Sequence, residues 1–220
     1  MSPRSRGSDT HAGAHPGGRP TRAQAAALDN RIREAALELF LRDGYEDTSM
    51  NAIAAAAHTT KPTLYARYPT KDEIFRTVIG WAVSRKDWPI PEPPTPDLDD
   101  LEQALRTIAQ TLLNRALDPS MVRLEQIAIA HASRYPDIAR RTYGSGTWPR
   151  HPIVVELLRR HAAEGTIEVD DPDRTAMDFL GLASGTPARL ASFGIPLDEQ
   201  GRQAHIESVV TLFLRALRPS

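Results

Sequence analysis

Apolar residues recur every three or four positions along most of the chain, which is the spacing that places side chains on one face of a helix. The first such stripe consists of Leu28, Ile32, Ala35, Ala36, Leu39 and Phe40, and Gly44 is suited to end that helix. Further stripes predict helices over residues 71–82, 98–117, 120–133, 136–142, 152–164, 172–193 and 198–217, the sixth of them kinked at Pro187. No stretch alternates between apolar and polar residues for long enough to form a strand, so the pattern predicts an all-α fold.

Residues 48–71 show a distinct pattern of two short helices followed by the start of a third. Thr48 is placed to cap the first helix, because a threonine hydroxyl accepts a hydrogen bond from an amide in the first turn. The apolar face of this helix would consist of Met50, Ile53, Ala54 and Ala57. Residues 58–60 then form a tight turn, so the second helix begins almost at once.

The second short helix is predicted over residues 61–67, with Thr60 or Lys61 as its cap. Pro62 falls in its first turn, where a missing N–H costs little. Leu64 is expected to face inward, which leaves facing outward Lys61, Thr63, Tyr65 and Arg67. A short, exposed, cationic helix held by another across a tight turn is typical of a helix-turn-helix that enters the major groove of DNA.

Two other helix starts carry the capping-box pattern, at Thr21–Gln24 and at Thr70–Glu73. Lys71 lies at the amino end of the helix that follows Thr70. Free backbone amides and the helix dipole already favour an anion at that end. We therefore expect Lys71 and the backbone beside it to hold a DNA phosphate.

The run from Ile32 to Phe75 reads I-x-x-AA-x-x-LF-x-x-x-GY-x-x-TS-x-x-x-IA-x-x-A-x-x-x-K-x-TLY-x-x-YP-x-KDEIF. This motif resembles the DNA-binding domain of TetR/AcrR-type regulators, and it fixes many positions over more than forty residues. It departs from the usual form at His58, where glycine is common, and at Pro62, which replaces a glycine or another small residue. The rest of the chain resembles the family only in being helical and of suitable length.

The resemblance implies that the second short helix reads DNA. Tyr65 is then a phosphate contact rather than a core residue, whereas Tyr68 matches the aromatic core position of the motif. Thr63 and Arg67 would reach base edges or phosphates, and Lys61 would point into the groove. The predicted DNA-binding set is Thr48, Thr60, Lys61, Pro62, Thr63, Tyr65, Arg67, Tyr68 and Lys71.

The same resemblance implies an inducer pocket among the C-terminal helices, and such pockets are mostly apolar. The candidate pocket residues are Trp81, Trp88, His131, Tyr135, Tyr143, Trp148 and Phe179, for each of which a plain core position is the alternative. It also implies that the last two long helices pair with those of a second copy. The candidate dimer residues are Gly181, Gly185, Ala188, Leu212, Phe213 and Leu217, with packing inside one chain as the alternative.

Composition divides the 220 residues into three regions. Residues 1–20 are polar and rich in glycine and proline, and they are predicted to be a disordered basic arm, either without a role or lying along DNA. Residues 21–75 form the predicted DNA-binding domain, and residues 76–220 form the predicted ligand-binding and dimerisation domain. Five prolines between residues 89 and 96 exclude a helix there and predict a stiff connector.

Charge and composition are compatible with a DNA-binding domain at the amino end, and they argue against membrane, secreted and enzyme classes. Residues 1–89 hold 13 Lys and Arg against 10 Asp and Glu, whereas residues 90–220 hold 14 against 18. The sequence has no cysteine, no apolar run long enough for a membrane span and no signal-peptide pattern, so we expect a cytoplasmic protein. No enzyme motif is present, and the sequence predicts no cofactor and no metal site.

The sequence therefore predicts a homodimeric transcriptional regulator that binds a palindromic operator in double-stranded DNA. A repressor released by a small-molecule effector is the favoured form. One alternative keeps DNA binding but has no small-molecule ligand. The other is a helical enzyme or small-molecule carrier in which the helix-turn-helix is incidental.

Overall fold

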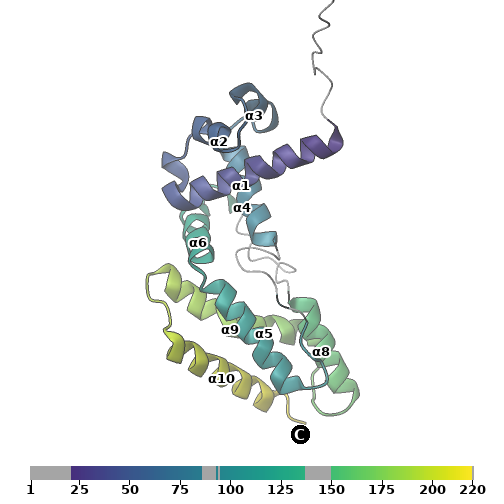
Figure 1. Cartoon of the computed structure of the whole chain (residues 1–220). Coiled ribbons are helices and arrows are strands. Elements are labelled where there is room, and N and C mark those ends of the chain that lie inside the picture. The colour runs from purple at the N-terminus through teal and green to yellow at the C-terminus, as the bar shows by residue number, and fades with distance from the viewer. Residues whose placement is uncertain (1–20, 86–92, 94, 137–149, 220) are drawn as a thin grey trace, which may run out of the picture.

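The computed structural model describes residues 21–85, 93, 95–136 and 150–219, and in that part of the chain all regular structure is helical (Figure 1). The helices are α1 (Arg22–Asp47), α2 (Met50–Ala56), α3 (Lys61–Arg67), α4 (Lys71–Ser84), α5 (Leu101–Ala116), α6 (Pro119–His131), α8 (His151–Ala163), α9 (Pro172–Ser192) and α10 (Glu199–Ala216). The predicted all-α class is confirmed. The predicted arm over residues 1–20, most of the proline connector and nearly all of the predicted helix 136–142 lie outside the described residues.

Side chains at the helix starts explain why most boundaries fall where the sequence places them. Thr21 and Gln24 form the complete capping box, with the Thr21 amide donating to Gln24 Oε1 at 2.9 Å and the Gln24 amide donating to Thr21 Oγ1 at 3.2 Å. Thr70 Oγ1 accepts from the Glu73 amide in the same way at 3.2 Å. Four aspartates, at positions 100, 118, 171 and 198, cap α5, α6, α9 and α10.

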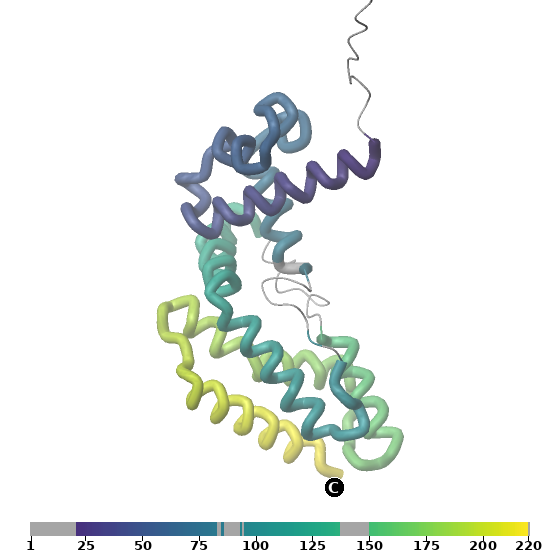
Figure 2. Tube along the Cα trace, in the orientation of Figure 1, coloured from purple at the N-terminus to yellow at the C-terminus, as the bar shows by residue number. Residues whose placement is uncertain are grey.

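Buried side chains fall into two clusters. The first joins α1–α4, which we call the N-terminal head, to α6. The second joins α5, α8, α9 and α10, which we call the C-terminal body. Figure 2 shows α6 running between the head and the body. This helix packs against both parts and therefore joins them.

The position of α6 was not anticipated, because it follows the proline connector and was assigned to the C-terminal domain. Its buried residues Leu124, Ile127 and Ala128 pack into the same cluster as Ile32, Phe40 and Phe75 of the head. Tyr135, just beyond the end of α6, is 5% exposed in that cluster. The division at residue 75 stays a prediction, and α6 packs with the head although it lies beyond that residue.

Helix α9 continues through Pro187, which lies in its interior and is buried. Proline has no N–H, so the carbonyl of Ala183 loses its usual donor four residues later. His205 Nε2 from α10 lies 3.2 Å from that carbonyl oxygen and 3.1 Å from the carbonyl oxygen of Leu182. Because carbonyl oxygens only accept, this nitrogen carries the proton and donates, which joins α10 to α9.

Replacing His205 by Ala is expected to lower the free energy of unfolding by about 1 kcal/mol, because the Ala183 carbonyl then loses its replacement donor. For a chain of this size that corresponds to a fall in Tm of roughly 2–4 °C. Thermal unfolding followed by circular dichroism measures it. Gln203→Ala, on an exposed position of the same helix, is the control and should change Tm little.

Candidate nucleic-acid interface

Helices α2 and α3 are held at a fixed angle by caps and by the turn between them. Ser49 Oγ accepts from the Ala52 amide at 3.1 Å, and Thr60 Oγ1 accepts from the Thr63 amide at 3.3 Å. His58 occupies the turn with φ of 49°, the positive value that its position in place of glycine predicts. The Thr59 amide donates to the Ala54 carbonyl at 2.9 Å, which ends α2 and directs the chain into α3.

Thr48 is not the cap of α2, as the sequence suggested, because the neighbouring Ser49 takes that role. The Thr48 side chain is 2% exposed, and its hydroxyl donates to the Gly44 carbonyl at 2.7 Å. Gly44 has φ of 84°, so it ends the regular part of α1 as expected and turns the chain back toward Thr48. The Thr48 hydroxyl is thus engaged within the head, and its contact with a phosphate stays a prediction.

Helix α3 matches its predicted bounds and Leu64 faces inward as predicted, but the opposite side of the helix carries a residue outside the predicted set. Leu64 is fully buried, and each residue advances the helix by about 100°. The two residues opposite Leu64 are therefore Pro62 and Ala66, and both are exposed. The predicted outward set takes alternate positions of the helix and therefore leaves out Ala66. Alternation suits a strand, whereas the helical period places positions 62 and 66 on the same side.

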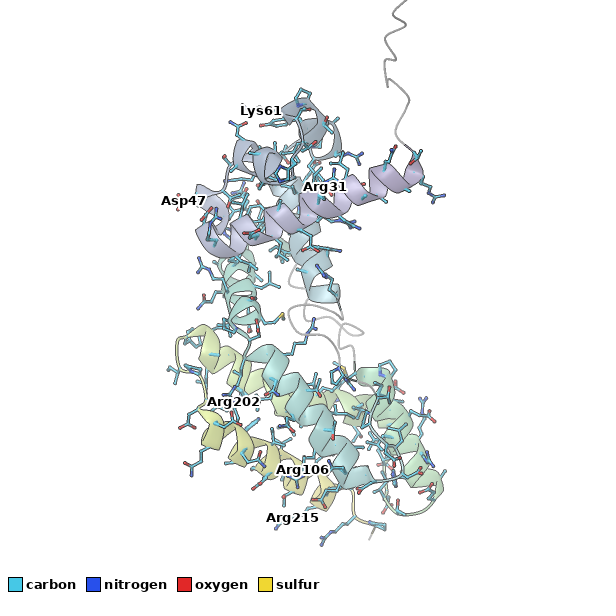
Figure 3. All side chains as sticks on the ribbon, in the orientation of Figure 1. Arg31, Asp47, Lys61, Arg106, Arg202 and Arg215 are labelled. Carbon is cyan, nitrogen blue, oxygen red and sulfur yellow. The ribbon has the colours of Figure 1, made fainter. Side chains whose placement is uncertain are left out.

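The residues expected to point outward divide into two groups. Lys61 and Tyr65 are exposed, Tyr65 to 46%, and Figure 3 places Lys61 at the end of the molecule remote from α10. Thr63 is half-buried, and its hydroxyl lies 2.8 Å from that of Thr60. Arg67 faces α1, where its Nη1 donates to Asp29 Oδ1 at 2.5 Å with a quarter of the side chain exposed.

Tyr68 ends α3 and packs partly buried against the first cluster, as the aromatic core position of the motif implies. Burial raises the pKa of its phenol, and the neighbouring carboxylate of Asp29 adds to the rise. Tyr68 therefore supports the interface from beneath. Contact of Arg67 with DNA stays a prediction.

Lys71 takes a different partner from the one expected. Its Nζ donates to the backbone carbonyls of Tyr45 at 2.8 Å and Glu46 at 3.0 Å, and it lies 4.4 Å from the centre of the Tyr45 ring. These carbonyls belong to the carboxyl end of α1, where a cation is favourable. Lys71 thus fastens α4 to α1, and a phosphate contact by the same ammonium remains untested.

Asp72, the next residue, is the point where the head meets the end of α6. The hydroxyls of Tyr45 and Tyr135 both donate to its Oδ1, and Arg134 Nη2 lies 3.0 Å from its Oδ2. The Tyr135 and Tyr45 hydroxyls, together with Arg134, hold the pKa of the Asp72 carboxyl below its usual value. Burial and the carboxylate raise the pKa values of both phenols, so the hydroxyls stay protonated as donors.

Three further hydrogen bonds join the head, α6 and the C-terminal body to one another. Arg123 Nε on α6 donates to the Leu41 carbonyl of α1 at 3.2 Å. One turn along α6, Gln126 Nε2 donates to the Ser192 carbonyl at the end of α9 at 2.9 Å. Arg115 of α5 donates to the Arg85 carbonyl just after α4 at 2.5 Å. These bonds link α5 directly, and α9 through α6, to the head.

The candidate pocket residues do not gather at one place within the described structure. Trp81 lies between the guanidinium groups of Arg33 and Arg85, at 5.2 and 4.7 Å from the ring centre. His131 and Tyr135 pack against Tyr45 and Phe75 at the junction with the head. Phe179 is fully buried against Phe213 in the C-terminal body. The remaining candidates Trp88, Tyr143 and Trp148 lie outside the described residues.

The candidate dimer residues separate into an outer and an inner group. Phe213 and Leu217 are 6% and 4% exposed and belong to the core of their own chain, so they are not on an open face. Ala188 is half-buried. Gly181, Gly185 and Leu212 are exposed, and Leu182, which was not anticipated, is 44% exposed beside them in sequence. Exposed leucines thus occur on both α9 and α10, and exposed glycines on α9.

Two kinds of feature are absent from the described ranges. No helix there is both long and apolar enough to cross a membrane. The residues placed by the structure also include no group of three or more His, Cys, Asp or Glu side chains arranged to hold a metal ion.

Comparisons with known proteins cover both parts of the chain. A family model described as bacterial regulatory proteins of the tetR family matches residues 32–78, and one described as the C-terminal domain of AefR-like transcriptional repressors matches residues 103–219. The HTH-type transcriptional regulator SrpR of Pseudomonas putida is 23% identical over 168 residues, which is 76% of each chain.

Solved structures agree over nearly the whole length. The Flavonoid-responsive Regulator FrrA is 32% identical with a TM-score of 0.68, and the match covers 89% of this chain and 98% of that one. A TetR-family regulator from Mesorhizobium loti MAFF303099 is 24% identical with a TM-score of 0.73, covering 91% and 100%. Proteins of this family are regulators rather than enzymes. With a family model over more than half its length and a helix-turn-helix at its amino end, this chain belongs to the TetR family of DNA-binding transcriptional regulators.

Proposed function

We propose that this chain acts as a homodimeric repressor that binds a palindromic operator in duplex DNA and leaves it when a small molecule enters the C-terminal body. The observation that carries the DNA contact is α3, a short helix exposed at one end of the molecule with Lys61 and Tyr65 on its surface. One such helix offers few contacts. Two copies about one helical turn of DNA apart would read a palindrome and add their binding energies. Binding to chromosomal DNA would place the protein in the cytoplasm.

The outer face of α9 and α10 supports the homodimer. Gly181 and Gly185 lie in the interior of α9, where each glycine costs roughly 0.5–1 kcal/mol relative to alanine. A methyl group at either position would meet nothing within 4 Å, so packing inside the chain does not explain them. A helix of a second copy, lying close against these glycines and covering Leu182 and Leu212, would account for both the small residues and the exposed leucines.

Two observations support release by a small molecule. The similar protein FrrA is described as flavonoid-responsive, and its fold matches this chain over most of its length. Arg115 of α5 bonds to Arg85 at the end of α4, and α6 bonds to α9 through Gln126 and to α1 through Arg123, so a shift in the body would change the separation of the two α3 helices. A regulator without a small-molecule ligand is the alternative, and a thermal-shift screen that includes flavonoids would distinguish the two.

The direct test is binding to DNA from upstream of the protein's own gene, measured by fluorescence anisotropy at several salt concentrations against unrelated duplex. Tyr65→Phe should weaken binding about fivefold for each protomer through the loss of one phosphate hydrogen bond, with the salt dependence unchanged. Lys61→Ala should weaken binding and also lower the salt slope by about one for each protomer, because one fewer counterion is released.

Arg159→Ala is the matched control for charge, since Arg159 is exposed on α8, far from α3. It should bind the operator like the wild type. If folded Tyr65→Phe and Lys61→Ala proteins both bound as tightly as the control, α3 would not be the DNA contact.

A further inference from the structure

The side of α3 opposite its buried leucine is apolar. Leu64 anchors the helix in the core at 0% exposure, and Pro62 and Ala66 lie about 160° around the helix from it. They are four residues apart, so their side chains sit one above the other on the exposed surface. Neither carries a polar atom in its side chain, and both are exposed.

We call the pair formed by Pro62 and Ala66 the ridge. The polar side chains nearest to it either bond within the protein or lie beside the ridge. Arg67, the residue type that most often reads guanine, is held to Asp29 at 2.5 Å on the inner side of the helix. The Thr63 hydroxyl lies against that of Thr60 at 2.8 Å. Lys61 and Tyr65, four residues apart, are exposed together on one flank of the ridge, where an ammonium and a phenol can contact phosphates or the edge of the groove.

We propose that Pro62 and Ala66 read the 5-methyl group of a thymine in each half-site of the operator. This inference rests on the proposed function, because it requires α3 to enter the major groove. There thymine presents a methyl group that an apolar side chain can cover, whereas the other bases present polar atoms or a C–H at the same edge. A polar base edge against Pro62 and Ala66 would lose water without gaining a partner. The preference for thymine thus follows both from the apolar contact that Pro62 and Ala66 offer and from their lack of a polar group that could bond to another base.

The experiment begins with selection of bound duplexes from random sequence by the full-length wild-type protein. Each thymine of the selected palindrome is then replaced in turn by deoxyuridine, which removes the methyl group and leaves base pairing unchanged. One position in each half-site should lose affinity about fourfold, the effect of one buried methylene-sized group, and about fifteenfold when both half-sites are changed. Thymines outside the half-sites serve as controls and should show no change.

An Ala66→Ser variant tests the protein side of the same contact. On the unmodified operator it should bind less tightly than the wild type. Deoxyuridine at the sensitive position should then cause almost no further loss of affinity. If this variant does not fold, the wild-type series alone decides the question. A palindrome in which deoxyuridine has no effect at any half-site thymine overturns the inference while leaving the proposed function in place. Failure of the selection to give any preferred sequence would instead overturn the proposed function.

Discussion

A Leu212→Glu variant is expected to sediment as a folded monomer and to lose at least about a hundredfold in operator affinity. Leu212 is 57% exposed within one chain, so the substitution costs the protomer little stability. In the proposed dimer the same position is covered by the second copy, and a carboxylate there would be buried without a partner. A monomer places only one α3 on the DNA and loses the gain that comes from linking two half-sites.

Sedimentation equilibrium and operator anisotropy on the same preparation measure both effects. The control is Ile129→Glu, which places the same carboxylate on an exposed apolar position of α6. Arg215→Glu would not serve, because it changes the charge on α10 itself. Ile129→Glu should leave the oligomeric state unchanged. A Leu212→Glu protein that remained dimeric would show that the second copy does not bind this face.

The Gly181→Ala variant tests the same face, because its expected effect is stabilising if the face is exposed to water and destabilising to the dimer if a second copy covers it. If this face met only water, alanine would raise the free energy of unfolding by roughly 0.5–1 kcal/mol through helix propensity. If another helix lies against it, the added methyl group would push the two helices apart and weaken the dimer. Gly80→Ala is the matched control, since Gly80 is also in a helix interior and an added methyl group meets nothing within 4 Å. It should stabilise the protein and leave the dimer intact.

Replacing Asp72 by Ala should lower the free energy of unfolding by about 3 kcal/mol, equivalent to a fall in Tm of roughly 6–12 °C. The carboxylate accepts from two phenols and pairs with Arg134, so its removal takes the charged acceptor from both hydroxyls and the partner from the guanidinium. Asp43→Ala is the control, because Asp43 pairs with the adjacent Arg42 at the surface and such pairs contribute little.

The stabilisation by Asp72 should also depend on pH in a defined direction. The Tyr135 and Tyr45 hydroxyls keep the pKa of Asp72 lower in the folded chain than the usual value of about 3.9. Its contribution is therefore complete above that value and disappears as the pH falls through the lowered folded pKa. Urea unfolding of the wild type and of Asp72→Asn at neutral and acid pH measures this. The difference between the two proteins should be largest at neutral pH and shrink toward pH 3, and a constant difference would contradict the assignment.

Most of the helices could be predicted from the sequence because their causes are local. Apolar spacing, the Thr21–Gln24 box, Thr70 and the capping aspartates act within a few residues, and the structure begins and ends the helices close to the predicted positions. The bounds of α3, the inward Leu64 and the positive φ of His58 were available in the same way. The motif from Ile32 to Phe75 also identified the family, because it fixes residue types at many positions together.

What each side chain contacts was decided only by the tertiary structure. Arg67 and Lys71 looked like free cations until α1 brought Asp29 and the carbonyls of Tyr45 and Glu46 within reach. Phe213 and Leu217 belong to the predicted dimer set, yet they are buried within their own chain, where α10 packs on α5 and α9. Helix α6 joined the head because its apolar stripe meets α1 and α4, which lie far away in sequence. Local spacing determines which face of a helix is apolar, but a partner distant in the chain determines what that face, and each charge beside it, comes to contact.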